Sequence, residues 1–169
     1  MSNVRFIADT HFGHEKLIRN LRNMEPEKHD QLIIDNWNRV VTKKDITYVL
    51  GDFVFEKPDL IEKYLLQLKG EIRIIGGNHD DRRCCQKFRE LGVTVLGCLE
   101  YKGFICTHIP VHPNELSRFE SLGQGWAANI HGHTHEELVG DHYYLNVCCE
   151  HVGYTPRTLD EILEIYWKK

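Results

Sequence analysis

The amino-acid sequence predicts an α+β protein in which helices lie outside a mixed arrangement of β-strands. Two observations lead to this fold class. In the first half of the chain, short apolar runs alternate with segments whose apolar residues recur at helical spacing. In the second half, strand-like runs follow one another with only turns between them, as in hairpins. A purely parallel sheet would not produce this second pattern, so a mixed arrangement fits better.

Short runs rich in apolar and β-branched residues predict the strands. In chain order they are Val4–Ala8, Ile46–Leu50, Ile72–Ile75, Val93–Leu96, Cys98–Tyr101, Phe104–Thr107, Ala127–His131 and Tyr143–Cys148. Between two of them, Lys102 and Gly103 predict a tight hairpin turn.

Helical spacing and capping residues predict the helices. In chain order, they cover Glu15–Arg22, a segment capped by Asp30 that runs to Val41, a segment from Pro58 to a stop at Gly70, Arg83–Leu91, and a last helix after the capping box Thr158–Glu161. Asp accepts hydrogen bonds from the amides of a first helical turn, Pro fits that turn, and Gly favours a helix end. The segment Met24–Glu27 reads as a turn before the Asp30 cap.

The composition limits the size and class of the protein. With 169 residues, 41% of them hydrophobic, the chain is long enough for one buried core and short for two, so we expect a single domain over residues 1–169. No apolar run is long enough for a signal peptide or a membrane anchor, and we expect a cytoplasmic protein. A net charge of −4 lacks the basic footprint of a non-specific nucleic-acid-binding module.

The six cysteines have no spacing that points to zinc or to redox chemistry. Two adjacent pairs, Cys84-Cys85 and Cys148-Cys149, accompany Cys98 and Cys106, and no Cys-x-x-Cys occurs. We therefore expect reduced thiols, several of them small core residues.

Five short polar motifs occur in a fixed order, and the first four follow predicted strands. They are Asp9-Thr10-His11, Gly51-Asp52, Gly77-Asn78-His79-Asp80, His108 and Gly132-His133-Thr134-His135. Taken singly, the first three motifs are ordinary turn chemistry, and His108 alone can be a half-buried histidine with its hydrogen bonds satisfied. The two histidines of the last motif are less ordinary, because alternate positions of an extended segment point both rings to one site. Strands that end in Asp, Asn and His, however, bring these polar side chains to one edge of a sheet. Together the oxygen and nitrogen donors predict a cage for two divalent metals, and thus metal-assisted hydrolysis of a phosphate ester.

This motif set, over residues 9 to 135, resembles the calcineurin-like metallophosphoesterases. Two flanking segments, Asp9–His14 and Leu145–Ile162, resemble a group of small bacterial and phage phosphoesterases within them. The resemblance implies the metallo-dependent phosphatase fold, a four-layer αββα sandwich of two mixed sheets, with the metals at one end of the sheets.

The resemblance also implies a ligand for each metal position. The first metal would be held by Asp9, His11, Asp52 and His135. The second would be held by Asp52, Asn78, His108 and His133, with Asp52 as the bridge. Carboxylate, amide and imidazole ligands without thiolate suit borderline ions such as Mn, Fe, Co, Ni or Zn, and we favour two manganese ions.

His79 is the remaining family residue and is expected not to bind metal. Its neighbour Asp80 can accept a hydrogen bond and favour the imidazolium form of His79. A protonated His79 can then donate to the leaving oxygen or stabilise charge in the transition state. The alternative is a ring that only orients Asn78 or Asp9.

Two further residues are candidates for substrate binding. His14 lies just beyond Asp9 and His11 and can either touch the substrate phosphate or simply begin a helix. Arg118 lies on a polar loop that follows His108, where it can grip phosphate with two nitrogens or remain a solvated surface residue.

The sequence lacks two features of related enzymes, and their absence narrows the range of substrates that we expect. The Arg that follows Gly-Asp in related protein serine/threonine phosphatases is absent from Gly51–Lys57, and the chain has no room for the capping domain of related nucleases. An open site favours a phosphodiester, either a small molecule or a short nucleic acid, cleaved by a metal-bound hydroxide. A phosphomonoesterase is the alternative. A non-catalytic scaffold on the same fold is the alternative from another class, but all eight expected positions, His79 included, are filled.

Overall fold

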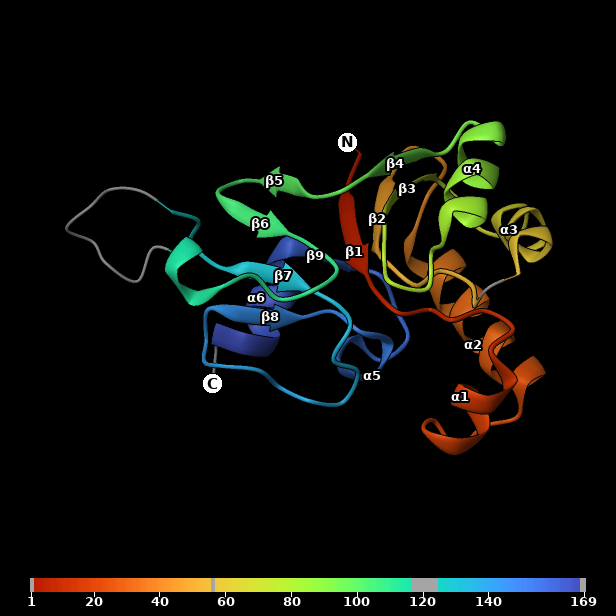
Figure 1. Ribbon diagram of the computed structural model, residues 1–169, viewed down its shortest axis with the longest axis horizontal. Coiled ribbons are helices and arrows are strands. Elements are labelled where there is room, and N and C mark those ends of the chain that lie inside the picture. Colours follow the sequence, from red (N-terminus) through yellow and green to blue (C-terminus); the bar gives the residue numbers. More distant parts are fainter. Residues whose placement is uncertain (1, 56, 117–124, 168–169) are drawn as a thin grey trace.

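The computed structural model describes residues 2–55, 57–116 and 125–167 and contains two mixed sheets. The first sheet has the strand order β4-β3-β2-β1-β9, and the second has the order β5-β6-β7-β8 (Figure 1). The first sheet consists of β1 (Val4–Ile7), β2 (Ile46–Leu50), β3 (Glu71–Ile75), β4 (Thr94–Leu96) and β9 (Arg157–Thr158). The second consists of β5 (Leu99–Tyr101), β6 (Phe104–Cys106), β7 (Asn129–His131) and β8 (Tyr144–Asn146).

Each sheet combines parallel pairs with one antiparallel pair. In the first sheet β1 to β4 are parallel to their neighbours, and β9 runs antiparallel to β1. In the second sheet β6, β7 and β8 are parallel, and β5 forms an antiparallel hairpin with β6. The hairpin turns at Lys102 and Gly103, whose φ angles of 51° and 81° suit such a turn. The predicted mixed arrangement is therefore confirmed.

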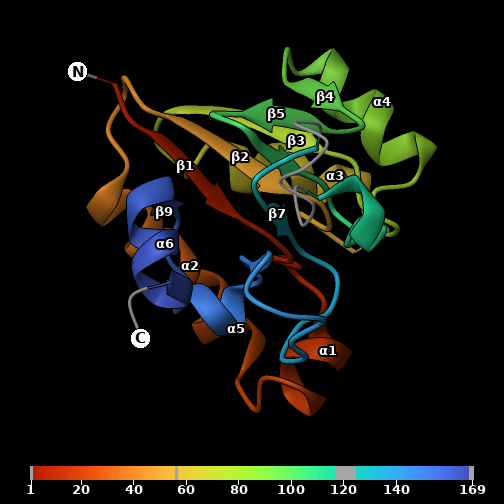
Figure 2. The ribbon, with the colours of Figure 1, turned by 90° about the vertical axis from the view of Figure 1, so that its left-hand side faces the viewer.

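Helices flank the two sheets. They are α1 (Glu15–Asn20), α2 (Pro26–Val40), α3 (Pro58–Leu65), α4 (Arg82–Glu90), α5 (Cys149–Val152) and α6 (Leu159–Trp167), with a 3-10 turn at Pro113–Glu115. The helices α2, α3 and α4 lie on one side of the first sheet, whereas α6 packs against β1, β9 and β8 (Figures 1 and 2). The architecture is that of the metallo-dependent phosphatase fold.

Two helix ends differ from the sequence predictions by more than two residues. The helix α2 begins at Pro26, so the prediction of a turn over Met24–Glu27 and a cap at Asp30 is wrong. Asp30 instead lies inside the helix, where its carboxylate accepts hydrogen bonds from the Tyr64 hydroxyl (2.5 Å) and the Gly13 amide (3.2 Å). Proline fits the first helical turn, which explains the earlier start. The helix α3 ends at Leu65, and a turn leads on to Gly70.

The capping box before α6 is confirmed. The Thr158 amide donates to Glu161 Oε2 (2.7 Å), and the Glu161 amide donates back to Thr158 Oγ1 (3.3 Å). The short elements α5 and β9 were not predicted, because two to four residues carry too little periodic signal.

The two sheets meet at the carboxyl end of β1. The Ala8 amide donates to the Val147 carbonyl (2.8 Å), and the Cys149 amide donates to the Ala8 carbonyl (3.2 Å). Phe6, Ile7 and Ala8 are fully buried in the core that both sheets share. This join fixes the first polar motif, directly after Ala8, between the two sheets.

No helix in the described ranges is long and apolar enough to cross a membrane. All six cysteines are free thiols, as expected, and Cys84, Cys106, Cys148 and Cys149 are buried.

Candidate metal centre

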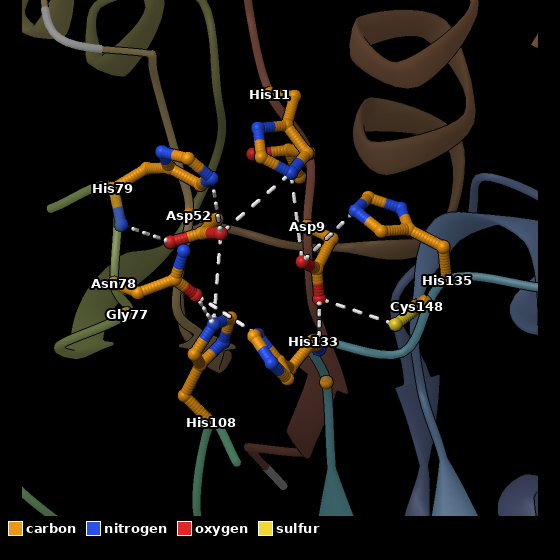
Figure 3. Close-up of polar contacts among 12 residues, drawn as sticks. Asp9, His11, Asp52, Gly77, Asn78, His79, His108, His133, His135 and Cys148 are labelled. Carbon is orange, nitrogen blue, oxygen red and sulfur yellow. Dashed lines mark hydrogen bonds and ion pairs between the residues drawn. The ribbon is translucent and has the colours of Figure 1, made fainter. Parts of the chain in front are cut away.

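The structure brings all seven predicted metal ligands to one edge of the two sheets (Figure 3). Asp9 and His11 follow β1, Asp52 follows β2 and Asn78 follows β3. His108 follows β6, and His133 and His135 follow β7. We call Asp9, His11 and His135 the buried set and Asn78, His108 and His133 the outer set. Asp52 lies between them.

The chain turns sharply at the predicted ligands, and the backbone shows it. Asp9, His11, Asp52, His133 and His135 all have positive φ angles, between 46° and 74°. Residues other than glycine seldom adopt this left-handed backbone conformation, which costs on the order of 1–3 kcal/mol per residue. Such outliers cluster where surrounding structure holds them for function.

The glycines of the motifs make room for ligands from other motifs. A Cβ atom on Gly77 would lie 2.2 Å from Asp52 Oδ1, and one on Gly132 would lie 2.5 Å from Asp9 Oδ2. Both contacts are shorter than atoms allow. The Gly in each motif is therefore required by the close approach of a neighbouring carboxylate.

The buried set encloses nitrogen and oxygen atoms that lack protein partners. His11 Nε2 lies 3.5 Å from Asp9 Oδ1 and 3.7 Å from Asp52 Oδ2, and His135 Nε2 lies 3.8 Å from Asp9 Oδ1. Within the described residues, Asp9 Oδ1 and His11 Nε2 are buried and make no hydrogen bond. Buried polar atoms are rarely left unpaired, so these atoms fit a metal ion that they would coordinate.

The outer set converges on the amide oxygen of Asn78. His108 Nε2 lies 2.8 Å and His133 Nδ1 lies 2.9 Å from Asn78 Oδ1. His108 Nε2 also lies 3.5 Å from Asp52 Oδ2, so Asp52 faces both sets. The second ring nitrogen of His108 lies 2.8 Å from the Leu50 carbonyl oxygen, which fixes the ring orientation.

The electrostatics of the buried carboxylates also fit a cation. Burial and the neighbouring charge of Asp9 raise the pKa of Asp52 to about 6. Burial opposes ionisation of Asp9 too, but the rings of His11, His108 and His135 lower its pKa below the ordinary range. Burial lowers the pKa of His11 to about 4, which keeps the ring neutral, as metal binding requires. A divalent ion would relieve the repulsion between the two carboxylates.

His79 lies beside the predicted ligands, with its side chain about one-third exposed. Its Nε2 lies 4.0 Å from Asp52 Oδ2, and its ring packs near those of His11 and Phe55 at centroid distances of 5.6 Å and 4.9 Å. Its backbone amide donates to Asp52 Oδ1 (2.9 Å). Because the ring is partly exposed beside the predicted ligands, it can contact a group bound at the metal centre.

Asp80 does not pair with His79 as the sequence predicted. Its carboxylate accepts from the backbone amides of Asp52 (2.8 Å), Gly77 (3.0 Å) and Phe53 (3.3 Å). It is buried under the loop, and burial raises its pKa to about 6. The local reason is that the turn after β3 curls over these amides and directs the carboxylate inward. Asp80 holds two ligand-bearing loops together.

His14 lies near the centre, and its ring stacks on that of Phe55 at 3.8 Å between centroids. The ring also lies 5.5 Å from that of His11. Burial and the charge of His79 lower the pKa of His14 to about 4, so the ring is neutral near pH 7. Arg118 lies outside the described residues.

Two buried charged residues behind the centre were missed by the sequence analysis. Glu150 Oε1 lies 3.2 Å from His135 Nδ1 and accepts from Arg22 Nε at 2.8 Å. Arg22 also donates to the carbonyl oxygens of Asp9 (2.6 Å) and Thr10 (3.2 Å). These contacts orient the His135 ring and brace the loop that carries Asp9 and His11. In the sequence, Glu150 follows closely after the predicted strand Tyr143–Cys148, and neither Glu150 nor Arg22 belongs to a motif.

Cys148 is a third residue at the centre that no motif indicated. Its thiol donates to Asp9 Oδ2 (3.1 Å), which also accepts from the His133 amide (2.8 Å). Burial and the charge of Asp9 raise the pKa of the Cys148 thiol, so it stays protonated and acts as a donor. These two contacts occupy Asp9 Oδ2, and Asp9 Oδ1 faces His11 and His135.

This geometry defines a metal-dependent phosphoester hydrolase, and the comparisons agree. The chain belongs to the calcineurin-like phosphoesterase superfamily, whose family model matches residues 3–149. An uncharacterized protein of Methanocaldococcus jannaschii is 33% identical over 99% of this chain and 93% of its own length. The gene 66 protein of Mycobacterium phage D29 is 29% identical over 82% of this chain and 81% of its own.

A solved structure shares the fold. A protein of unknown function from Aquifex aeolicus superposes with a TM-score of 0.74 at 24% identity, over 98% of this chain and all of that chain. This likeness extends the fold assignment beyond the segment that the family model matches.

Proposed function

We propose that the protein hydrolyses phosphodiesters with two divalent transition-metal ions, one at each ligand set. The observation that carries the proposal is the arrangement around Asp52. Its carboxylate faces His11 of the buried set at 3.7 Å and His108 of the outer set at 3.5 Å. Manganese is the ion we favour for this mixture of carboxylate, amide and imidazole donors.

The protein residues have separate tasks in this proposal. Asp9, His11 and His135 would hold one ion, Asn78, His108 and His133 the other, and Asp52 both. When bound, such a pair of ions activates water and clamps the phosphate oxygens. His79 would donate a proton to the leaving oxygen, since its ring borders the centre and is partly open to solvent. Asp52 would orient His79 through its backbone amide.

The approach to His79 favours a diester over a monoester. Phe55 and His14 form this side of the centre, and the His14 ring is neutral near pH 7. A phosphodiester carries one negative charge, whereas a monoester carries close to two near neutral pH and benefits more from a bidentate Arg. The aromatic faces of Phe55 and His14 at this side suit the diester.

A reconstitution experiment tests this function. Metal-stripped protein would be reloaded separately with Mn, Fe, Co, Ni and Zn, and assayed on nitrophenyl monoesters and diesters, cyclic nucleotides and short oligonucleotides. We expect two ions per chain and faster diester than monoester hydrolysis. A higher kcat/KM on the monoesters would establish the phosphomonoesterase instead, and loaded protein that cleaves none of the panel would reject the proposal.

A further inference from the structure

A pocket adjoins the metal centre on the side of the outer set. It has a volume of about 330 Å³ and is lined by Gly76, Gly77, Asn78, Gly97, Thr107, His108 and Ile109. We call it the seam pocket, because its walls come from the ends of β3 and β4 in the first sheet and of β6 in the second. Two of its lining residues, Asn78 and His108, are predicted metal ligands, so the pocket is continuous with the centre.

The seam pocket and His79 border different parts of the centre. The His79 ring packs near His11 of the buried set, whereas the pocket is lined by two residues of the outer set. A phosphodiester has two ester arms, and only the leaving arm needs a proton. If the leaving oxygen faces His79, the retained arm can extend along Asn78 and His108 into the pocket.

The lining fits a flat group with apolar faces. Three glycines leave bare peptide surface, and Ile109 is 54% exposed although its side chain is apolar. The hydroxyl of Thr107 is already used, because it donates to the Ile109 carbonyl (2.7 Å). Bare peptide surface and an aliphatic side chain suit a planar ring better than a charged group.

We propose that the seam pocket binds the retained ester arm of the substrate and that this arm carries a planar ring, as an aryl or nucleoside group does. This inference rests on the proposed function, because it names the substrate class of the same centre. It predicts that the protein distinguishes diesters by the arm that is not cleaved.

The glycines allow the pocket to be filled without disturbing the centre. A Cβ atom on Gly97 would meet nothing within 4 Å, and one on Gly76 would meet only the Leu96 carbonyl at 3.9 Å. Neither residue has a positive φ angle, so a side chain is tolerated there. Gly97→Leu is therefore the pocket-filling variant. The matched control is Cys98→Leu, which adds the same side chain at an exposed neighbour outside the lining.

A binding measurement tests the pocket apart from turnover. Phenylphosphonate presents a ring on phosphorus that cannot be hydrolysed, and methylphosphonate presents a methyl group. In calorimetry with metal-loaded protein we expect phenylphosphonate to bind about 10-fold more tightly, from the apolar area that the ring buries. Gly97→Leu should remove this preference and leave methylphosphonate binding and metal content unchanged, whereas Cys98→Leu should retain it. Equal affinities in the unaltered protein, or a preference that survives Gly97→Leu, would overturn the inference.

Kinetics give the second test. Bis(p-nitrophenyl) phosphate and methyl p-nitrophenyl phosphate share a leaving group and differ in the retained arm. Gly97→Leu should lower kcat/KM about 10-fold on the first and leave it unchanged on the second, and Ile109→Ala should lower it about 5-fold on the first only. Equal losses on both substrates would contradict the pocket. A ring preference in binding without turnover of either ester would support the pocket and reject the proposed phosphodiesterase.

Discussion

The two ligand sets differ in how firmly the protein holds them. Asp9 and His11 of the buried set are fully buried, and Glu150 and Arg22 brace that set from behind. In the outer set, Asn78 and His133 are exposed, and their side chains contact each other and the His108 ring. Only His108 is anchored to the core, at the Leu50 carbonyl. One half of the centre is thus built into the core, and the other half lies closer to the surface.

This difference has a consequence for metal binding. Preorganised ligands lose little freedom when an ion binds, whereas exposed side chains must be ordered at that moment. We therefore expect the buried set to bind its ion more tightly than the outer set.

The largest effect is expected for Asp52→Asn, because Asp52 faces both sets. A neutral amide cannot bridge two cations as a carboxylate does. Both metal affinities should therefore fall by more than the roughly 10–100-fold that is lost when a residue that only orients a metal ligand is replaced. Titration calorimetry of metal-stripped protein should show two sites before and none of comparable affinity after the change. Normal binding in the variant would contradict the shared role of Asp52.

His79→Ala should act on the reaction and leave both metals in place. If His79 protonates the leaving oxygen, kcat should fall about 10²–10⁴-fold on an unactivated diester and much less on a nitrophenyl diester. Elemental analysis provides the control, since metal content should not change. Equal losses on both esters would mean that His79 stabilises charge instead, and loss of metal would make it a structural residue.

Glu150→Gln should affect one set only. The change leaves the size of the side chain but removes the charge that orients His135 and pairs with Arg22. We expect the affinity of the buried set to fall roughly 10–100-fold while the outer set is unchanged. Glu25→Gln, at an exposed ion pair with Arg19, is the matched control. An equal loss at both sites would show that Glu150 supports the fold rather than the set.

Asp45→Asn should have no effect on the metal affinity of either set. Asp45 is buried away from the centre and accepts from the amides of Asn3 (2.7 Å) and Thr42 (2.8 Å). Its replacement should lower the free energy of unfolding by about 1–3 kcal/mol near neutral pH, with metal affinities unchanged. A change in either metal affinity would show that the two regions are coupled.

The pH dependence of this effect has a definite sign. Burial opposes ionisation of Asp45, but the hydrogen bonds lower its pKa below the ordinary value. Its stabilising contribution is therefore complete above the pKa of the unfolded chain and disappears as the pH falls through the folded pKa. Denaturant unfolding of both proteins across the acidic range should show the stability difference shrinking toward low pH.

The sequence predicted the features that depend on neighbours in the chain. Strands that end in Asp, Asn and His could be read directly, and so could the capping box of Thr158 and Glu161. The partners of Asp80 could not, because the curl of the turn decides whether its carboxylate faces His79 or the buried amides. Arg22 and Glu150 are 128 positions apart, and neither belongs to a motif, so only the folded chain brings them together behind His135.

Five of the predicted metal ligands have a left-handed backbone conformation, so the residues that form the centre also lower the stability of the fold. At His133 the φ angle of 74° would suit Gly, and the exposed side chain contributes little to the core. A Gly there should make the metal-free chain more stable by up to about 1–2 kcal/mol. Laboratory selection for heat resistance alone would thus erode the centre. Selection for heat resistance together with turnover would have to gain its stability elsewhere in the fold.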